Sequence, residues 1–234
     1  MSSSHPTRVE FTGELKAIQD DVLRLGSMVD RQIHRAIEAL RKQNVELAKQ
    51  VIELDQTIND QRWKVEDGTI RIIARQSPIA GDLRHVMASV HIATNLERMG
   101  DHAEGIARLT LRIADEPLLK ELVDIPEMAA IASRMLTESL DAFVNKDAER
   151  AREIASWDVE VDRLYEIVYR DLLAAMIADP QTVPRATHLL WVAHNLERIA
   201  DRVTNICERI IFAVTGQFEE VNYKNYGDQF AHTN

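Results

Sequence analysis

The chain has 234 residues, of which 45% are hydrophobic, 28% are charged and 5% are aromatic. These proportions are ordinary for a soluble globular protein that buries a core, and they exclude an intrinsically disordered chain. The formal net charge of -10 argues against nonspecific nucleic-acid binding, because such binding needs basic side chains that neutralise phosphates.

Cysteine content and apolar runs bear on the compartment. Cys207 is the only cysteine, so the sequence holds neither a disulfide framework nor a cysteine-based zinc motif, and it suits a reducing cytoplasm. The first residues contain no apolar segment of signal-peptide type, and no apolar run reaches the roughly 18 residues of a membrane span. We therefore expect a cytoplasmic chain that does not span a membrane.

Apolar residues recur every three or four positions through the first half, which is the spacing of one face of an amphipathic helix. The pattern predicts helices over residues 14–40, from a capping Asn44 to Ser77, and from there to about residue 114. Residues 1–13 are predicted to be a flexible N-terminus. Because glycine, proline and aromatic residues are few and helix-forming residues are common, we expect an all-α protein.

The second half repeats this pattern after a boundary. Residues 115–125 are rich in acids and proline, and we interpret them as a linker. Further helices are predicted from Pro126 to about Asn145, from a capping Asp147 to Asp179, and from about Thr182 to Gly216. The tail, residues 217–234, is predicted to be irregular.

Two short correspondences indicate an internal repeat. NLERMGDH at 95–102 resembles NLERIADR at 195–202, and DQTIN at 55–59 resembles DVEVD at 158–162. Each pair lies at an equivalent place in its half of the chain. The sequence therefore predicts two copies of a three-helix bundle, residues 14–114 and residues 126–216.

Oxygen-bearing side chains recur four residues apart on the middle and last helices of each copy, which stacks them on one helix face. The positions are Asp55, Asn59, Glu97 and Asp101 in the first copy and Asp158, Asp162, Glu197 and Asp201 in the second. If the two helices pack side by side, these groups could meet, and a cation would relieve their repulsion. Carboxylates without thiolates suit Mg, Ca, Mn or Fe better than structural zinc.

Other interpretations of these acids stay open. They could form a solvated face, or Arg98 and Arg198 could neutralise the acids of the neighbouring helix, since each arginine points away from the glutamate that precedes it. A metal-dependent hydrolase is a further alternative, although no phosphate loop, nucleophile motif or Glu-x-x-His pair occurs. Among the histidines, His102 is expected to lie nearest the acids, and Cys207 is expected to be a packing residue.

Several longer stretches together carry a family resemblance. They are VIELDQTIND at 51–60, RIIARQSPIAGDLR at 71–84, NLERMGDHAEGIAR at 95–108, DVEVD at 158–162 and NLERIADRVTNICERI at 195–210. In this order and combination they resemble the PhoU family of phosphate-transport regulators, across both copies. The resemblance implies two three-helix bundles side by side, a cytoplasmic homodimer, and multinuclear metal clusters of Fe, Zn, Mn or Mg at E/D-x-x-x-D motifs.

The resemblance also implies ligands for each bundle. They are Asp55, Glu97 and Asp101 in the first and Asp158, Asp162, Glu197 and Asp201 in the second, with Asn205 and Glu208 as weaker candidates. Asn59 stands where the full motif has an acid, so the first site is expected to be weaker, and Ala200 replaces the glycine of the first copy.

The resemblance further implies a role without catalysis. Such proteins are thought to repress phosphate uptake and the phosphate-starvation response by linking the ATPase subunit of a phosphate ABC transporter to a sensor histidine kinase. Membrane association would then occur only through these partners. A metal-dependent helical enzyme and a metal-free helical scaffold remain the alternatives.

Overall fold

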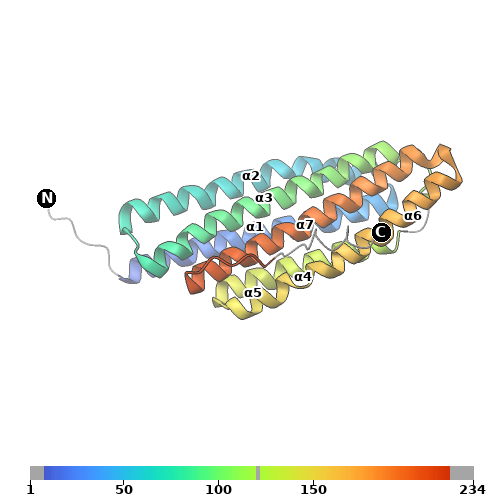
Figure 1. Ribbon diagram of the computed structural model, residues 1–234. Coiled ribbons are helices and arrows are strands. Elements are labelled where there is room, and N and C mark those ends of the chain that lie inside the picture. Colours follow the sequence, from blue (N-terminus) through green and yellow to red (C-terminus); the bar gives the residue numbers. More distant parts are fainter. Residues whose placement is uncertain (1–7, 120–121, 222–234) are drawn as a thin grey trace, which may run out of the picture.

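The computed structural model describes residues 8–119 and 122–221, which form two three-helix bundles lying side by side (Figure 1). The first bundle contains α1 (Arg8–Lys42), α2 (Val45–Gln76) and α3 (Ala80–Ile113). The second contains α4 (Asp124–Asn145), a middle helix broken into α5 (Ala148–Ala155) and α6 (Asp158–Ala178), a short 3-10 turn (Pro180–Thr182) and α7 (Val183–Thr215). Within the described residues there is no strand, so the all-α prediction and the tandem bundles are confirmed.

Local chemistry sets the helix ends. The side chain of Asn44 accepts a hydrogen bond from the Leu47 backbone N–H at 3.0 Å, which caps α2 as predicted. Ser77 ends α2 in the left-handed region at φ 45° and donates its N–H to the Ile73 carbonyl. Gly216 closes α7 at φ 77°, a conformation that favours glycine.

Two boundaries differ from the sequence prediction. Helix α1 begins at Arg8 rather than at residue 14, so residues 8–13 are helical and not a flexible terminus. Phe11 explains part of this extension because its side chain is buried in the core. Helix α4 begins at Asp124, within the predicted linker, and Ile125 is already buried.

The predicted fifth helix is in fact two helices. Helix α5 ends at Ala155 and α6 begins at Asp158, with Ser156 and Trp157 between them. The Ser156 hydroxyl donates to the Glu153 carbonyl at 2.6 Å, and such side-chain bonds compete with the helical backbone pattern. As a result, Asp158 lies in the first turn of a new helix rather than in the middle of a long one.

The helices pack in a fixed order around α3 and α7. Helix α2 packs on α3, α3 packs on α7, and α7 packs on α6, while α1 packs against α4 across the two bundles. We call the α2/α3 contact the first seam, the α6/α7 contact the second seam and the α3/α7 contact the central seam. Gly105 allows close approach in the central seam, because a Cβ there would lie 3.2 Å from the Asn195 side-chain oxygen.

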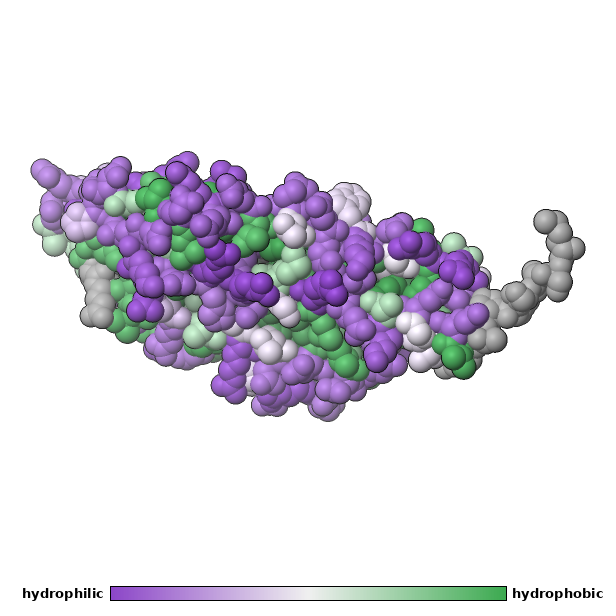
Figure 2. All heavy atoms as spheres, turned by 180° about the vertical axis from the view of Figure 1, so that it is seen from behind, coloured by the Kyte–Doolittle hydropathy of each residue, from purple (hydrophilic) through white to green (hydrophobic). Residues whose placement is uncertain are grey.

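The outer surface is that of a helical bundle in water. Polar side chains cover most of the face shown in Figure 2, and apolar side chains interrupt them in separate patches. None of the helices in the described ranges has a long enough apolar stretch to cross a bilayer.

Candidate functional site

The first seam brings part of its predicted ligand set together. Asp55 on α2 lies close enough to Asp101 and Glu104 on α3 that these carboxylates, after burial, raise its pKa. Asn59 donates its amide N–H to Asp55 Oδ2 at 3.0 Å, and Asp55 Oδ1 is buried without a hydrogen-bond partner. The pKa of Asp101 is also raised, first by loss of solvent and then by Glu97 and Glu104, although the residue keeps an exposed edge.

The sequence analysis missed two charged residues of the first seam. Arg62 forms an ion pair with Glu66 on its own helix, and its Nε lies 3.9 Å from Glu97 Oε1 on α3. Glu104 extends the acidic row of α3 by one turn and is paired with Arg108 at 2.5 Å. Both residues could have been identified from their spacing in the sequence, because Arg62 follows Asp55 by two helical turns and Glu104 follows Asp101 by one.

The second seam carries the more buried acids. Asp158 is 3% exposed and Asp201 is 8% exposed, whereas Asp162 and Glu197 are half-buried. Tyr165 of α6 lies across the seam from α7, its ring centroid 6.4 Å from that of His194, and burial and then the Glu197 carboxylate raise the pKa of its phenol. Asp158 lies in the first turn of α6, at the positive end of the helix dipole.

Basic side chains also reach the acids of the second seam. Arg198 Nη1 donates to Asp201 Oδ2 at 2.9 Å, and His194 Nδ1 lies 3.7 Å from Glu197 Oε2. The expectation that Arg198 could serve only the neighbouring helix was therefore wrong. Residues three apart lie on the same side of a helix, so Arg198 pairs with an acid of its own helix.

The acids of the two seams are donors of the type that metal ions bind, but their side chains are not positioned as a metal site. Among the residues of 8–119 and 122–221, no three His, Cys, Asp or Glu side chains stand close enough together to hold one ion. The second seam nevertheless combines four carboxylates from two packed helices, two of them buried, and such oxygen donors suit hard divalent cations.

Both bundles match one protein family. The PhoU domain model matches residues 22–110 and residues 125–210, which is one copy in each bundle. The chain belongs to the PhoU family. It is 39% identical, over 92% of its length and 99% of the relative's, to the "Phosphate-specific transport system accessory protein PhoU homolog" of Clostridium acetobutylicum. It is 38% identical, over 89% of its length and 86% of the relative's, to the "Phosphate-specific transport system accessory protein PhoU" of Escherichia coli.

Solved PhoU structures share this fold. The crystal structure of PhoU from Pseudomonas aeruginosa has a TM-score of 0.84 at 33% identity, covering 88% of this chain and 100% of the other. The structure of the phosphate transport system regulatory protein PhoU from Streptococcus pneumoniae has a TM-score of 0.83 at 32% identity, covering 89% and 99%. The resemblance seen in the sequence and the tandem PhoU bundles are thus confirmed.

The weaker ligand candidates on α7 of this PhoU chain lie beyond Asp201. Asn205 is half-buried one turn further along. Glu208 accepts a hydrogen bond from the Val221 backbone N–H at 3.3 Å, and burial raises the pKa of its carboxyl group. Glu208 therefore contacts the segment that follows α7. Cys207 is confirmed as a packing residue, because burial raises the pKa of its thiol to about 12.

His102 lies in the central seam, not among the acids where it was expected. Its Nδ1 is 3.0 Å from Asn195 Oδ1 on α7, and burial is the main cause that lowers its pKa. Arg198 and Arg202 lower it further. His102 follows Asp101 directly in sequence, and consecutive helix positions point to different sides, so it faces α7 while Asp101 faces α2.

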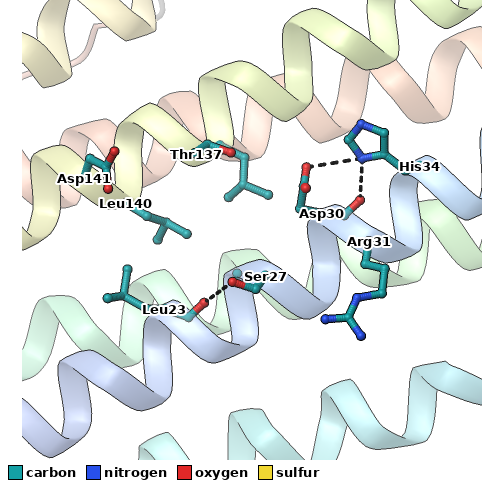
Figure 3. Close-up of a pocket in the computed structure, with 10 residues that line it drawn as sticks. Leu23, Ser27, Asp30, Arg31, His34, Thr137, Leu140 and Asp141 are labelled. Carbon is teal, nitrogen blue, oxygen red and sulfur yellow. Dashed lines mark hydrogen bonds and ion pairs between the residues drawn. The ribbon is translucent and has the colours of Figure 1, made fainter.

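A groove of about 750 Å³ between α1 and α4 is separate from all of these residues. Figure 3 shows Asp30 and His34 of α1 at one end, linked by an ion pair at 3.5 Å, and Leu140 and Asp141 of α4 at the other. Ser133 donates to Asp30 Oδ1 at 2.5 Å, which ties α4 to α1 there. None of the predicted metal ligands lines this groove.

Proposed function

We propose that this chain is a noncatalytic accessory protein of phosphate-specific transport that represses phosphate uptake and the phosphate-starvation response. The observation that carries the proposal is the match of both bundles to the PhoU domain, together with relatives named as accessory proteins over most of both chains.

We propose that the repression works through an adaptor role in the cytoplasm. One set of helix faces would contact the ATPase subunit of a phosphate ABC transporter, and another would contact a sensor histidine kinase. Amphipathic helix surfaces are common docking elements, and exposed aromatic side chains such as Trp63 and Trp191 are suitable anchors. Association as a homodimer belongs to the same proposal.

The second seam is the proposed metal centre. Asp158, Asp162, Glu197 and Asp201 would hold divalent or trivalent ions such as Mn, Fe, Zn or Mg. A bound cation would supply positive charge between α6 and α7, neutralising carboxylates that otherwise repel each other. The protein's own contribution is to hold these four side chains on two packed helices, two of them away from water.

The regulatory role is tested by deleting the gene in its host and growing the cells with ample phosphate. We expect phosphate uptake and the transcripts of phosphate-starvation genes to rise, and a plasmid copy of the wild-type chain to restore repression. Unchanged transcripts and uptake in the deletion strain would refute the role. Purified chain assayed on phosphoester substrates with Mn²⁺ is expected to show no turnover, whereas turnover that depends on Glu197 would favour the hydrolase alternative.

A further inference from the structure

We infer that Arg62 is an internal counter-ion that takes the place of a metal ion in the first seam, so that metal binding is confined to the second seam. This inference rests on the proposed metal-binding function and assigns it to one bundle.

Arg62 lies partly buried among the carboxylates of the first seam. It pairs with Glu66 on α2 and reaches toward Glu97 on α3, and the three side chains are 18%, 22% and 20% exposed. Charges so far withdrawn from water interact more strongly than charges on the surface. A guanidinium group keeps its charge at any physiological pH and offers several donors to carboxylates.

Two other acids of the first seam, Asp55 and Glu104, are also paired within the protein. The Asn59 amide nitrogen donates to Asp55 Oδ2 at 3.0 Å, and Arg108 pairs with Glu104 at 2.5 Å. The Asn59 side chain therefore points a donor at Asp55, where a metal site needs oxygen lone pairs. Asp55 Oδ1 is buried without a hydrogen-bond partner and would accept a cation, but a single oxygen does not make a metal site.

The equivalent positions of the second seam carry different groups. Tyr165 follows Asp158 by two helical turns, as Arg62 follows Asp55, and its ring centroid lies 6.4 Å from that of His194, which precedes Glu197 by three residues on α7. Asp162 replaces Asn59. The second seam thus has one more carboxylate, and a neutral phenol where the first seam has Arg62. The arginine of the second seam, Arg198, is 40% exposed and pairs with Asp201 of its own helix, whereas Arg62 is 18% exposed and reaches from α2 toward α3. The affinity of an oxygen site for a divalent cation rises with the charge of its ligands.

Exchanging these two positions between the seams tests the inference. The full chain is stripped with a chelator, dialysed against MnCl₂ alone, and its Mn²⁺ content per chain is measured by elemental analysis. The variant Asn59→Asp/Arg62→Tyr is expected to raise the bound Mn²⁺ roughly two-fold, because both seams then have the second seam's ligand charge. The reciprocal variant Asp162→Asn/Tyr165→Arg is the matched control and should lose most of the wild-type Mn²⁺.

Other outcomes separate this inference from the proposed function. If Glu97→Gln/Asp101→Asn lowers the Mn²⁺ content of the otherwise wild-type chain, the first seam binds metal and the inference is wrong, while the metal-binding function stands. If no variant and no wild-type chain binds Mn²⁺, both are wrong. Circular-dichroism melting shows whether each variant folds, and Arg62→Gln, which removes only the charge, is the milder substitution. A folded Arg62→Gln chain with unchanged Mn²⁺ content would also overturn the inference.

Discussion

The two seams show how one helix pair can balance negative charge in two ways. The first seam places Arg62 and the Asn59 amide among its acids, whereas the second places Tyr165 and Asp162 at the equivalent positions. The acidic motif on the last helix is nearly the same in both. A repeated acidic motif therefore does not by itself mean a repeated metal site, because residues on the facing helix decide the local charge.

The middle helices differ as well. Helix α2 runs unbroken past Asp55, but its counterpart is interrupted at Ser156 and Trp157, so Asp158 begins α6. The unpaired backbone N–H groups of a helix N-terminus favour a carboxylate there. Asp158, at only 3% exposure, thus lies at the positive end of a helix dipole, whereas burial and neighbouring acids raise the pKa of Asp55.

Removing the acids of the second seam should have the largest effect. In Glu197→Gln/Asp201→Asn we expect Mn²⁺ affinity to fall at least about ten-fold, because two proposed ligands lose their charge. Isothermal titration with MnCl₂ measures this change. The matched control, Glu97→Gln/Asp101→Asn, should bind Mn²⁺ like the wild type. Equal losses in the two variants would show that the seams are alike.

Removing Arg62 should destabilise the first bundle. Arg62→Ala leaves the carboxylates of Glu66 and Glu97 partly buried without their cation, and we expect a loss of about 2 kcal/mol in the free energy of unfolding. Urea titration followed by circular dichroism measures it. Lys42→Ala is the control, because Lys42 pairs with Glu38 in an exposed setting and should change stability much less. Equal losses in the free energy of unfolding for the two variants would show that Arg62 stabilises the chain no more than an exposed ion pair does.

Gly100 of the first NLER copy should tolerate alanine poorly, although the second copy has Ala200 at the equivalent position. In Gly100→Ala the new Cβ would lie 3.1 Å from Gln32 Oε1 and 3.3 Å from Ile58, both buried. Overpacking should outweigh the gain in helix propensity, so we expect a net loss of about 1 kcal/mol in urea titration. The reverse change, Ala200→Gly, should cost about the same through propensity alone. A more stable Gly100→Ala chain would show that the first bundle tolerates the second bundle's packing.

The sequence predicted the helices and the repeat well, because each depends on spacing along one chain. Asn44 was identified as a cap, and the boundary between the bundles was placed within a few residues of the start of α4. The break at Ser156 was missed because the apolar period continues through it, although the Ser156 hydroxyl bonds the Glu153 carbonyl where α5 ends.

Spacing along the sequence did not predict the contacts between helices. The position of Arg62 between Glu66 and Glu97 depends on how α2 is rotated against α3, and the contact of His102 with Asn195 depends on α7. Both contacts could have been predicted from the register of the helices, because helices that pack antiparallel bring predictable positions together. The search for acids alone passed over the basic and amide side chains on the facing helix.

The smallest expected effect is a pH-dependent gain from Asp55→Asn. The raised pKa of Asp55 means that the folded chain holds this proton more readily than the unfolded chain, so the charged group costs stability above the raised pKa. The asparagine keeps an oxygen that can accept from Asn59 but carries no charge. We expect the free energy of unfolding to rise by about 0.5 kcal/mol at pH 7, the size of one relieved like-charge pair, and this gain to shrink as the pH falls through the raised pKa.

Urea titrations at pH 7 and at mildly acidic pH measure the gain, with Asp60→Asn on the exposed side of α2 as the control. A gain that is the same at both pH values would mean that the charge of Asp55 does not cost stability in the first seam.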